Sequence, residues 1–384
     1  MERGYRERGW RGAGGRGSAR LVLGVVCASV MIGWVCAGTN EGGVAHAIAR
    51  RYFNEGLGHV QGGKYQQAMR SFRQAIAYDR SIAEAYLNLG ACYEQLGRFE
   101  EGRPYYERAI ALDGENAQLR YLYGMALGRN GDMRGAVEQL ERAVYLAPRN
   151  MDYLYNLGVA YVGATQYVLA ARCFEQVGMV VTNRGAVWYN LGLTRLRLGQ
   201  TNEAEEAFAR VELDGECGAA AQYQLGMVAY ARGDYRGAVE RAKLAGALDP
   251  GLWEANVLRA EGHAGLGEYG EACRVLERVY LLQATSDLGK KLAKWYKAWG
   301  AIAQSNGEYR VALDRYRQAV RFEPGDGWAY VAAAECAAAV GDVGGAREEL
   351  ERARRHAREG ALHEAIERVE DKLREVGKGV GRGE

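Results

Sequence analysis

Residues that would interrupt a helix are scarce in this sequence. The 384 residues include four prolines, and few stretches alternate valine, isoleucine or threonine with polar residues as an exposed strand would. Alanine, leucine, glutamate and arginine are abundant, and these residues favour helix. We therefore expect an all-α protein without a sheet.

Cysteine is also sparse, and no CxxC pair is present. Outside one apolar segment the sequence has five cysteines: Cys92, Cys173, Cys217, Cys273 and Cys336. An odd number at these spacings predicts neither a zinc site nor a complete disulfide framework. We interpret Cys92 and Cys336 as small, buried apolar residues.

An excess of positive charge is missing from most of the chain. Residues 1–20 contain six Arg and two Glu, and without them 44 basic and 46 acidic residues remain. A nucleic-acid surface needs a basic patch, so we expect no nucleic-acid partner.

Catalytic motifs are absent as well. The sequence has no GxxxxGK[ST], no GxSxG and no Cys/His pair in a supporting context. The run from His363 to Glu367 resembles a zinc-protease motif but lacks its second histidine, and His59 and His263 fall at packing positions. We expect no enzyme activity, no metal site and no cofactor.

One long run lacks charge, and it follows an arginine-rich start. Residues 21–38 carry no charged side chain and follow the basic segment 1–20. Such a pair predicts a cleavable export signal, cut near Ala37 or Ala47, or an uncleaved membrane anchor. A lipid-modified Cys36 fits less well, because Trp34 and Val35 precede it instead of small residues. In either main case the arginines stay in the cytoplasm. We expect residues from about 40 onward in the cell envelope, the periplasm or its eukaryotic equivalent, soluble after cleavage or anchored.

A small residue recurs every 34 residues. The series is Gly56, Gly90, Gly124, Gly158, Gly192, Gly226 and Ala260, and after an insertion at residues 287–292 it continues with Gly300 and Ala334. Nine copies therefore run over residues 49–360, starting near 49, 83, 117, 151, 185, 219, 253, 293 and 327. We number each copy so that this small residue is position 8.

Each copy has the pattern of two helices joined by a turn. Position 15 is glycine in eight copies and Thr165 in the other, as expected where a helix ends in the left-handed conformation. Asp132, Asp234 and Asp342 follow directly and are suited to cap the second helix. Position 20 is mostly alanine and position 24 mostly large and apolar, so the two helices should pack closely.

This pattern resembles the tetratricopeptide repeat family. The resemblance implies a right-handed α-solenoid whose concave inner face is built from the first helix of each copy. Residues 361–376 have one apolar stripe and are expected to form the capping helix, followed by a disordered tail at 377–384. Gly102 and Pro104, inside the second helix of copy two, are expected to delay or kink it.

The first helices also carry a candidate partner-binding groove. Four tyrosines recur at position 5, asparagines stand beside them at position 6, and two methionines occupy position 9. These residues are Tyr121, Tyr155, Tyr189, Tyr223, Asn88, Asn156, Asn190, Met125 and Met227. The resemblance implies that inner-face asparagines can hold the backbone of an extended peptide. The alternative is that both residue types only support neighbouring copies. A groove predicts that Tyr155, Tyr189 and Tyr223 are partly accessible.

Copy eight offers a different inner surface. Lys294 and Lys297 lie at positions 2 and 5 and form a basic patch that could take an acidic ligand. The sequence thus favours a non-catalytic, exported scaffold that binds a protein or peptide. Two alternatives stay open: a structural subunit of an envelope assembly for secretion, lipoprotein handling or transport, and a binder of a small apolar ligand. Membrane attachment would run through residues 21–38.

Overall fold

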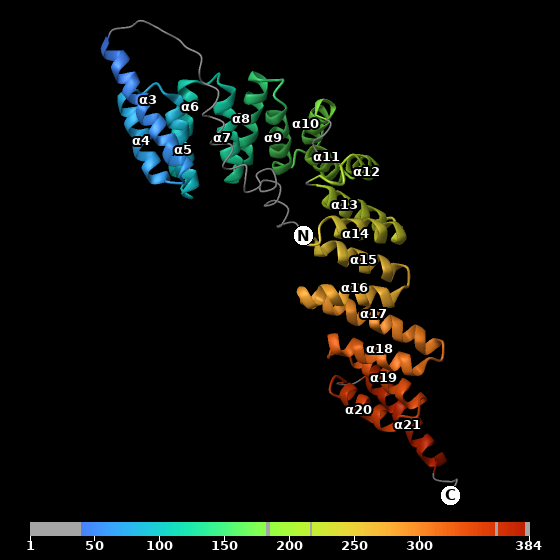
Figure 1. The fold of residues 1–384 in the computed structure, drawn as a ribbon. Helices are drawn as coiled ribbons and strands as arrows, with labels where there is room; N and C mark the ends of the chain where they lie inside the picture. Colours follow the sequence, from blue (N-terminus) through green and yellow to red (C-terminus); the bar gives the residue numbers. More distant parts are fainter. Residues whose placement is uncertain (1–39, 182–184, 216, 358–359, 381–384) are drawn as a thin grey trace. The chain divides into compact units, whose positions relative to one another are not determined.

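The computed structural model describes residues 40–181, 185–215, 217–357 and 360–380 (Figure 1). Within these ranges all regular structure is helical and no strand occurs, which confirms the expected all-α fold. The chain divides after Arg210 into two compact units, each with its own buried core. The predicted signal or anchor segment lies outside the described residues.

The first unit is a stack of five helix pairs. Its helices are α3 (Asn40–Gln61), α4 (Tyr65–Tyr78), α5 (Ala83–Gln95), α6 (Phe99–Leu112), α7 (Ala117–Arg129), α8 (Met133–Leu146), α9 (Met151–Gly163), α10 (Tyr167–Val180), α11 (Gly185–Arg197) and α12 (Thr201–Ala209). Each helix packs against the next one along the chain, so the unit is an α-solenoid. Helices α5, α7, α9 and α11 begin at the residues expected from the 34-residue period.

The second unit continues the same pattern and ends in a single helix. Its helices are α13 (Gly218–Ala231), α14 (Tyr235–Leu248), α15 (Trp253–Gly265), α16 (Tyr269–Leu282), α17 (Ser286–Ser305), α18 (Tyr309–Phe322), α19 (Gly327–Ala339), α20 (Val343–Arg354) and α21 (Ala361–Val380). Ile366 and Val369 of α21 are buried against the last helix pair. The capping helix thus covers the apolar end of this stack.

The turn inside each pair has the geometry that its residue at position 15 predicts. The eight glycines there have φ between +70° and +90°, and Thr165 adopts φ +61° although it carries a Cβ. The three predicted aspartate caps also form. Asp132, Asp234 and Asp342 each accept a hydrogen bond from the backbone N–H three residues later, at 2.8–2.9 Å. The turns fix where the second helix of each copy starts, and in copies three, six and nine the aspartate caps add to this.

The glycine at position 8 marks the closest approach of the two helices in a pair. A Cβ on Gly192 would lie 2.6 Å from the Phe208 ring, and one on Gly158 would lie 2.8 Å from Phe174. Phe174 and Phe208, both at position 24, are fully buried. The small residue on one helix therefore makes room for the large residue on the other.

Several boundaries differ from those expected. Helix α3 begins at Asn40, before the predicted start of copy one at residue 49. The insertion at 287–292 lengthens α17 at its N-terminus, where Thr285 caps it, so this helix begins before the predicted start of copy eight at residue 293. Helix α21 reaches Val380, past the predicted end at 376, so residues 377–380 of the expected disordered tail are helical, and residues 381–384 lie outside the described range.

Copy two keeps the helix pattern where a departure was expected, whereas copy five departs from it. Helix α6 starts on schedule at Phe99 in spite of Gly102 and Pro104, so the expected delay is wrong. A Cβ on Gly102 would lie 2.8 Å from the backbone oxygen of Gly90, and a tight helix contact therefore accounts for this glycine. Helix α12 has nine residues whereas α10 has fourteen, and copy five lacks the end of its second helix.

Candidate functional site

The inner face of the first unit contains a row of hydrogen bonds between successive copies. Asn156 Nδ2 donates to Tyr121 Oη at 3.1 Å, and Asn190 Nδ2 donates to Tyr155 Oη at 2.8 Å. Each bond joins position 6 of one copy to position 5 of the copy before. Asn156 also donates to the backbone oxygen of Asp152 at 2.8 Å. The asparagines therefore connect adjacent first helices, which agrees with the alternative that these residues support neighbouring copies.

Burial differs along the predicted groove. Tyr155 is 4% exposed and packs against Phe174, with 5.7 Å between the ring centroids, so the expectation that Tyr155 is accessible is wrong. Tyr121 and Tyr189 are half-buried, as is Tyr223 on α13 of the second unit. Asn156 is buried and Asn190 half-buried. Packing from the neighbouring copies covers α9 more than α7 or α11.

Asn88 belongs to the core and not to an open surface. It is 2% exposed, and its Nδ2 donates to the backbone oxygen of Glu84 at 2.8 Å. The preceding copy has Phe53 at position 5, which has no hydroxyl to accept a second bond. Asn88 thus repeats the local bond that Asn156 makes, without the bond between copies.

What stays partly open in the first unit is a set of half-buried apolar side chains on α7, α9 and α11. We call it the inner-face row; its members are Tyr121, Met125, Val162, Tyr189, Leu193 and Leu196. In the second unit, α13 presents Tyr223, Met227 and Tyr230 at the same positions, all half-buried. Whether these side chains contact a partner stays a prediction.

The two lysines of copy eight have different surroundings. Lys297 forms an ion pair with Asp326, the residue that caps α19, and Lys291 pairs with Glu261. Lys294 is exposed. Within the predicted basic patch, Asp326 thus balances the charge of Lys297. Lys294 is the lysine whose positive charge an acidic ligand would contact.

The side chain at position 25, in the second helix, joins several copies to the next, and sequence reasoning missed this. Arg73 donates to Tyr93 Oη at 2.6 Å. Tyr161 donates to Glu141 at 2.6 Å and Tyr296 donates to Glu277 at 2.8 Å. These bonds link a second helix to the first helix of the following copy. The signal was an Arg or Glu at position 25 in most copies; copy five has Ala209 there.

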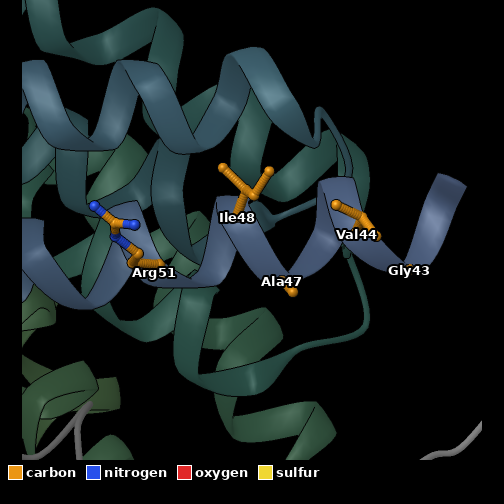
Figure 2. Close-up of a pocket in the computed structure, with 5 residues that line it drawn as sticks. All are labelled: Gly43, Val44, Ala47, Ile48 and Arg51. Carbon is orange, nitrogen blue, oxygen red and sulfur yellow. The ribbon is translucent and has the colours of Figure 1, made fainter.

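Other features that could indicate chemistry are weak in the described part of the chain. One depression lies along the first turns of α3, lined by Gly43, Val44, Ala47, Ile48 and Arg51 and open to solvent (Figure 2). Among the described residues there is no group of three or more His, Cys, Asp or Glu side chains placed to hold a metal ion. None of the described helices combines the length and the apolar character needed to cross a membrane.

The helix pairs, their turns and their 34-residue spacing match known family models. Two models, both described as tetratricopeptide repeat, match residues 53–117, 121–177 and 189–252 and residues 303–369. The chain belongs to the tetratricopeptide repeat family. Proteins of this family bind peptide or protein partners. Nothing in its described residues points to an enzyme.

Solved structures with a similar fold include other tetratricopeptide proteins. PilF of Pseudomonas aeruginosa is 22% identical, with a TM-score of 0.47 over 57% of this chain and 99% of that one. YrrB, described as having an unusual peptide-binding site, is 23% identical, with a TM-score of 0.42 over 48% and 95%. The pilus biogenesis factor PilW is 18% identical, with a TM-score of 0.43 over 56% and 96%. No curated protein matches the chain.

Proposed function

We propose that the protein is an exported scaffold that binds an extended segment of a partner protein along the inner-face row. The observation that carries the proposal is apolar surface on the first helices that stays exposed after the helices have packed together. On α11, Trp188, Leu191 and Gly192 form a buried stripe that holds the helix in the stack. Tyr189 and Leu193 lie beside this stripe and stay partly exposed although burial would be favourable, with the Tyr189 ring centroid 5.8 Å from that of Phe208.

The inner-face row suits a polypeptide better than a compact small molecule. Its side chains come from three successive first helices, which makes the surface long and shallow. Asn190 and Tyr189 place polar atoms beside the apolar groups, and a peptide backbone presents both kinds of partner. The buried Tyr155 and Asn156 take part in the two Tyr–Asn hydrogen bonds that fix the spacing of these helices, so these two side chains support the surface and are not themselves the contact.

Two charge substitutions test the proposal. We expect Met125→Arg together with Leu193→Arg to lower capture of the native partner, identified by cross-linking in its own membranes, by at least about tenfold, since buried interface anchors contribute about 2 kcal/mol or more each. Gln66→Arg, at an exposed position on α4, is the matched control and should capture normally. Unchanged capture by the double variant, with helix content retained, would contradict binding at this face.

Export rests on the first 38 residues, and the start of α3 supports one version of it. Helix α3 runs from Asn40 without interruption through Ala47, so cleavage near Ala37 leaves it whole whereas cleavage at Ala47 removes its first turns. A reporter that works only outside the cytoplasm, fused after Glu384, should be active. An inactive reporter beside an active control fusion would refute export. The mass of the native protein then separates cleavage from an intact anchor.

A further inference from the structure

We propose that the outward face of α10 pairs with the same face of a second copy, antiparallel, to form a symmetric dimer. This inference is independent of the proposed function, because the inner-face row lies on first helices and α10 is a second helix (Figure 1). It starts from four exposed apolar side chains at the two ends of α10. Val168 is 54% exposed, Leu169 39%, Met179 79% and Val180 66%.

Two of these side chains, Val168 and Leu169, are unusual for their positions. In most other copies the residues at positions 18 and 19 are polar or glycine: Gln66 and Gln67, Glu100 and Glu101, Arg134 and Gly135, Asn202 and Glu203, Arg236 and Gly237, and Gly270 and Glu271. Copy four has Val168 and Leu169 there. Tyr145 of α8, at the same position as Met179 one copy earlier, is 72% exposed and extends the apolar area. Helix α10 thus has exposed apolar side chains at both of its ends, which suits a contact with another molecule along its length.

The pattern along α10 identifies that molecule as a second copy. At 100° per residue, Val168, Arg172, Glu175 and Met179 fall within about 60° of one another around the helix. Read in either direction, the order is apolar, charged, charged, apolar. An antiparallel pair places Val168 opposite Met179 of the second copy and Arg172 opposite Glu175. Such a face is complementary to itself, which is the requirement for a twofold interface.

Charge selects the antiparallel arrangement over the parallel one. Arg172 is exposed, and in a parallel pair it would face the same arginine of the second copy. Glu175 receives an ion pair from Arg195 through Oε1, and its side chain is still 34% exposed. Glu175 can therefore accept a second cation. One helix of fourteen residues is about 21 Å long and covers less than the 1,200 Å² or so of a standard interface, so the dimer should be weak.

Sedimentation of the purified full chain over a range of concentrations tests the dimer. We expect reversible association, and we expect Met179→Glu to raise the dissociation constant at least about tenfold because it places an unpaired charge in the interface. Leu281→Glu is the matched control: Leu281 is 83% exposed at the equivalent position of copy seven, and its substitution should leave association unchanged. A monomer at every concentration, or a dimer that Met179→Glu does not weaken, overturns the proposal.

Cysteine cross-linking tests the antiparallel register. Val168→Cys and Met179→Cys chains, mixed and oxidised, should cross-link to each other, whereas neither should cross-link to itself, since the like positions would lie about 16 Å apart along the axis. The parent chain, with its seven native cysteines, gives the background. Equal amounts of like and mixed products overturn the register. If Met179→Glu instead abolishes binding to lipid vesicles or to another protein without changing the mass, the face has a different occupant and the dimer is wrong.

Discussion

Phe174→Ala is expected to lower the free energy of unfolding of the first unit by about 3–5 kcal/mol, the usual cost of emptying a phenylalanine site in a core. Phe174 is fully buried, and its ring lies where a Cβ on Gly158 would come within 2.8 Å. Tyr155 packs on the same ring. Glycine at position 8 cannot fill the space, so a cavity remains between α9 and α10.

Urea unfolding followed by far-ultraviolet circular dichroism measures this change. Met179→Ala on the same helix is the control, and because Met179 is 79% exposed its effect should stay within about 0.5 kcal/mol. If Phe174→Ala proved no more destabilising than Met179→Ala, the close packing of positions 8 and 24 would not be a source of stability.

The buried thiols are expected to react with alkylating reagents about 100 to 1,000 times more slowly than an ordinary cysteine, because each pKa unit removes a factor of ten in thiolate near neutral pH. Burial raises the pKa of Cys92 and Cys273 to about 12. Burial, with a nearby glutamate, raises the pKa of Cys173 and Cys336 to about 11. Site-resolved mass spectrometry after brief alkylation measures each rate.

Half-buried Cys217 is the internal reference and should be labelled first among the cysteines in the described residues. The same shifts predict how stability changes with pH. A raised folded-state pKa stabilises fully below the ordinary thiol pKa of 9.0, and this contribution is lost as the pH rises toward about 12. Burial also raises the pKa of Tyr123 to about 12, which acts in the same direction at higher pH. Equal labelling of Cys92 and Cys217 in the folded chain would contradict the burial.

The repeat architecture could be predicted from the sequence because it depends on side-chain size at fixed intervals. Position 15 favours glycine because the backbone there has a positive φ, and position 8 favours a small residue because the two helices are closest there. Both requirements can be recognised in a single sequence. Thr165 shows how strong the tertiary constraint is, since it adopts φ +61° at the one turn without glycine. Family models and structure agree on this part.

The candidate site was harder to predict, because exposure depends on neighbours that a single copy does not contain. Tyr155 and Tyr189 occupy the same position with the same residue, yet one is buried and the other half-buried. The sequence of copy eight alone suggests that Lys297 is free to bind an acidic ligand, but its partner Asp326 stands 29 residues later. The polar bonds at position 25 were missed for the same reason: each needs a partner in the following copy.

The division of the chain after Arg210 has a consequence for spectroscopy. Of the tryptophans in the described residues, Trp188 is the single one in the first unit, whereas Trp253, Trp295, Trp299 and Trp328 belong to the second. Two cores need not melt together, so one midpoint does not define the stability of the whole chain. The emission of the described tryptophans reports mainly on residues after 210, while circular dichroism weighs both units alike. The difference between the midpoints of the two denaturation curves therefore measures how far the two units unfold independently.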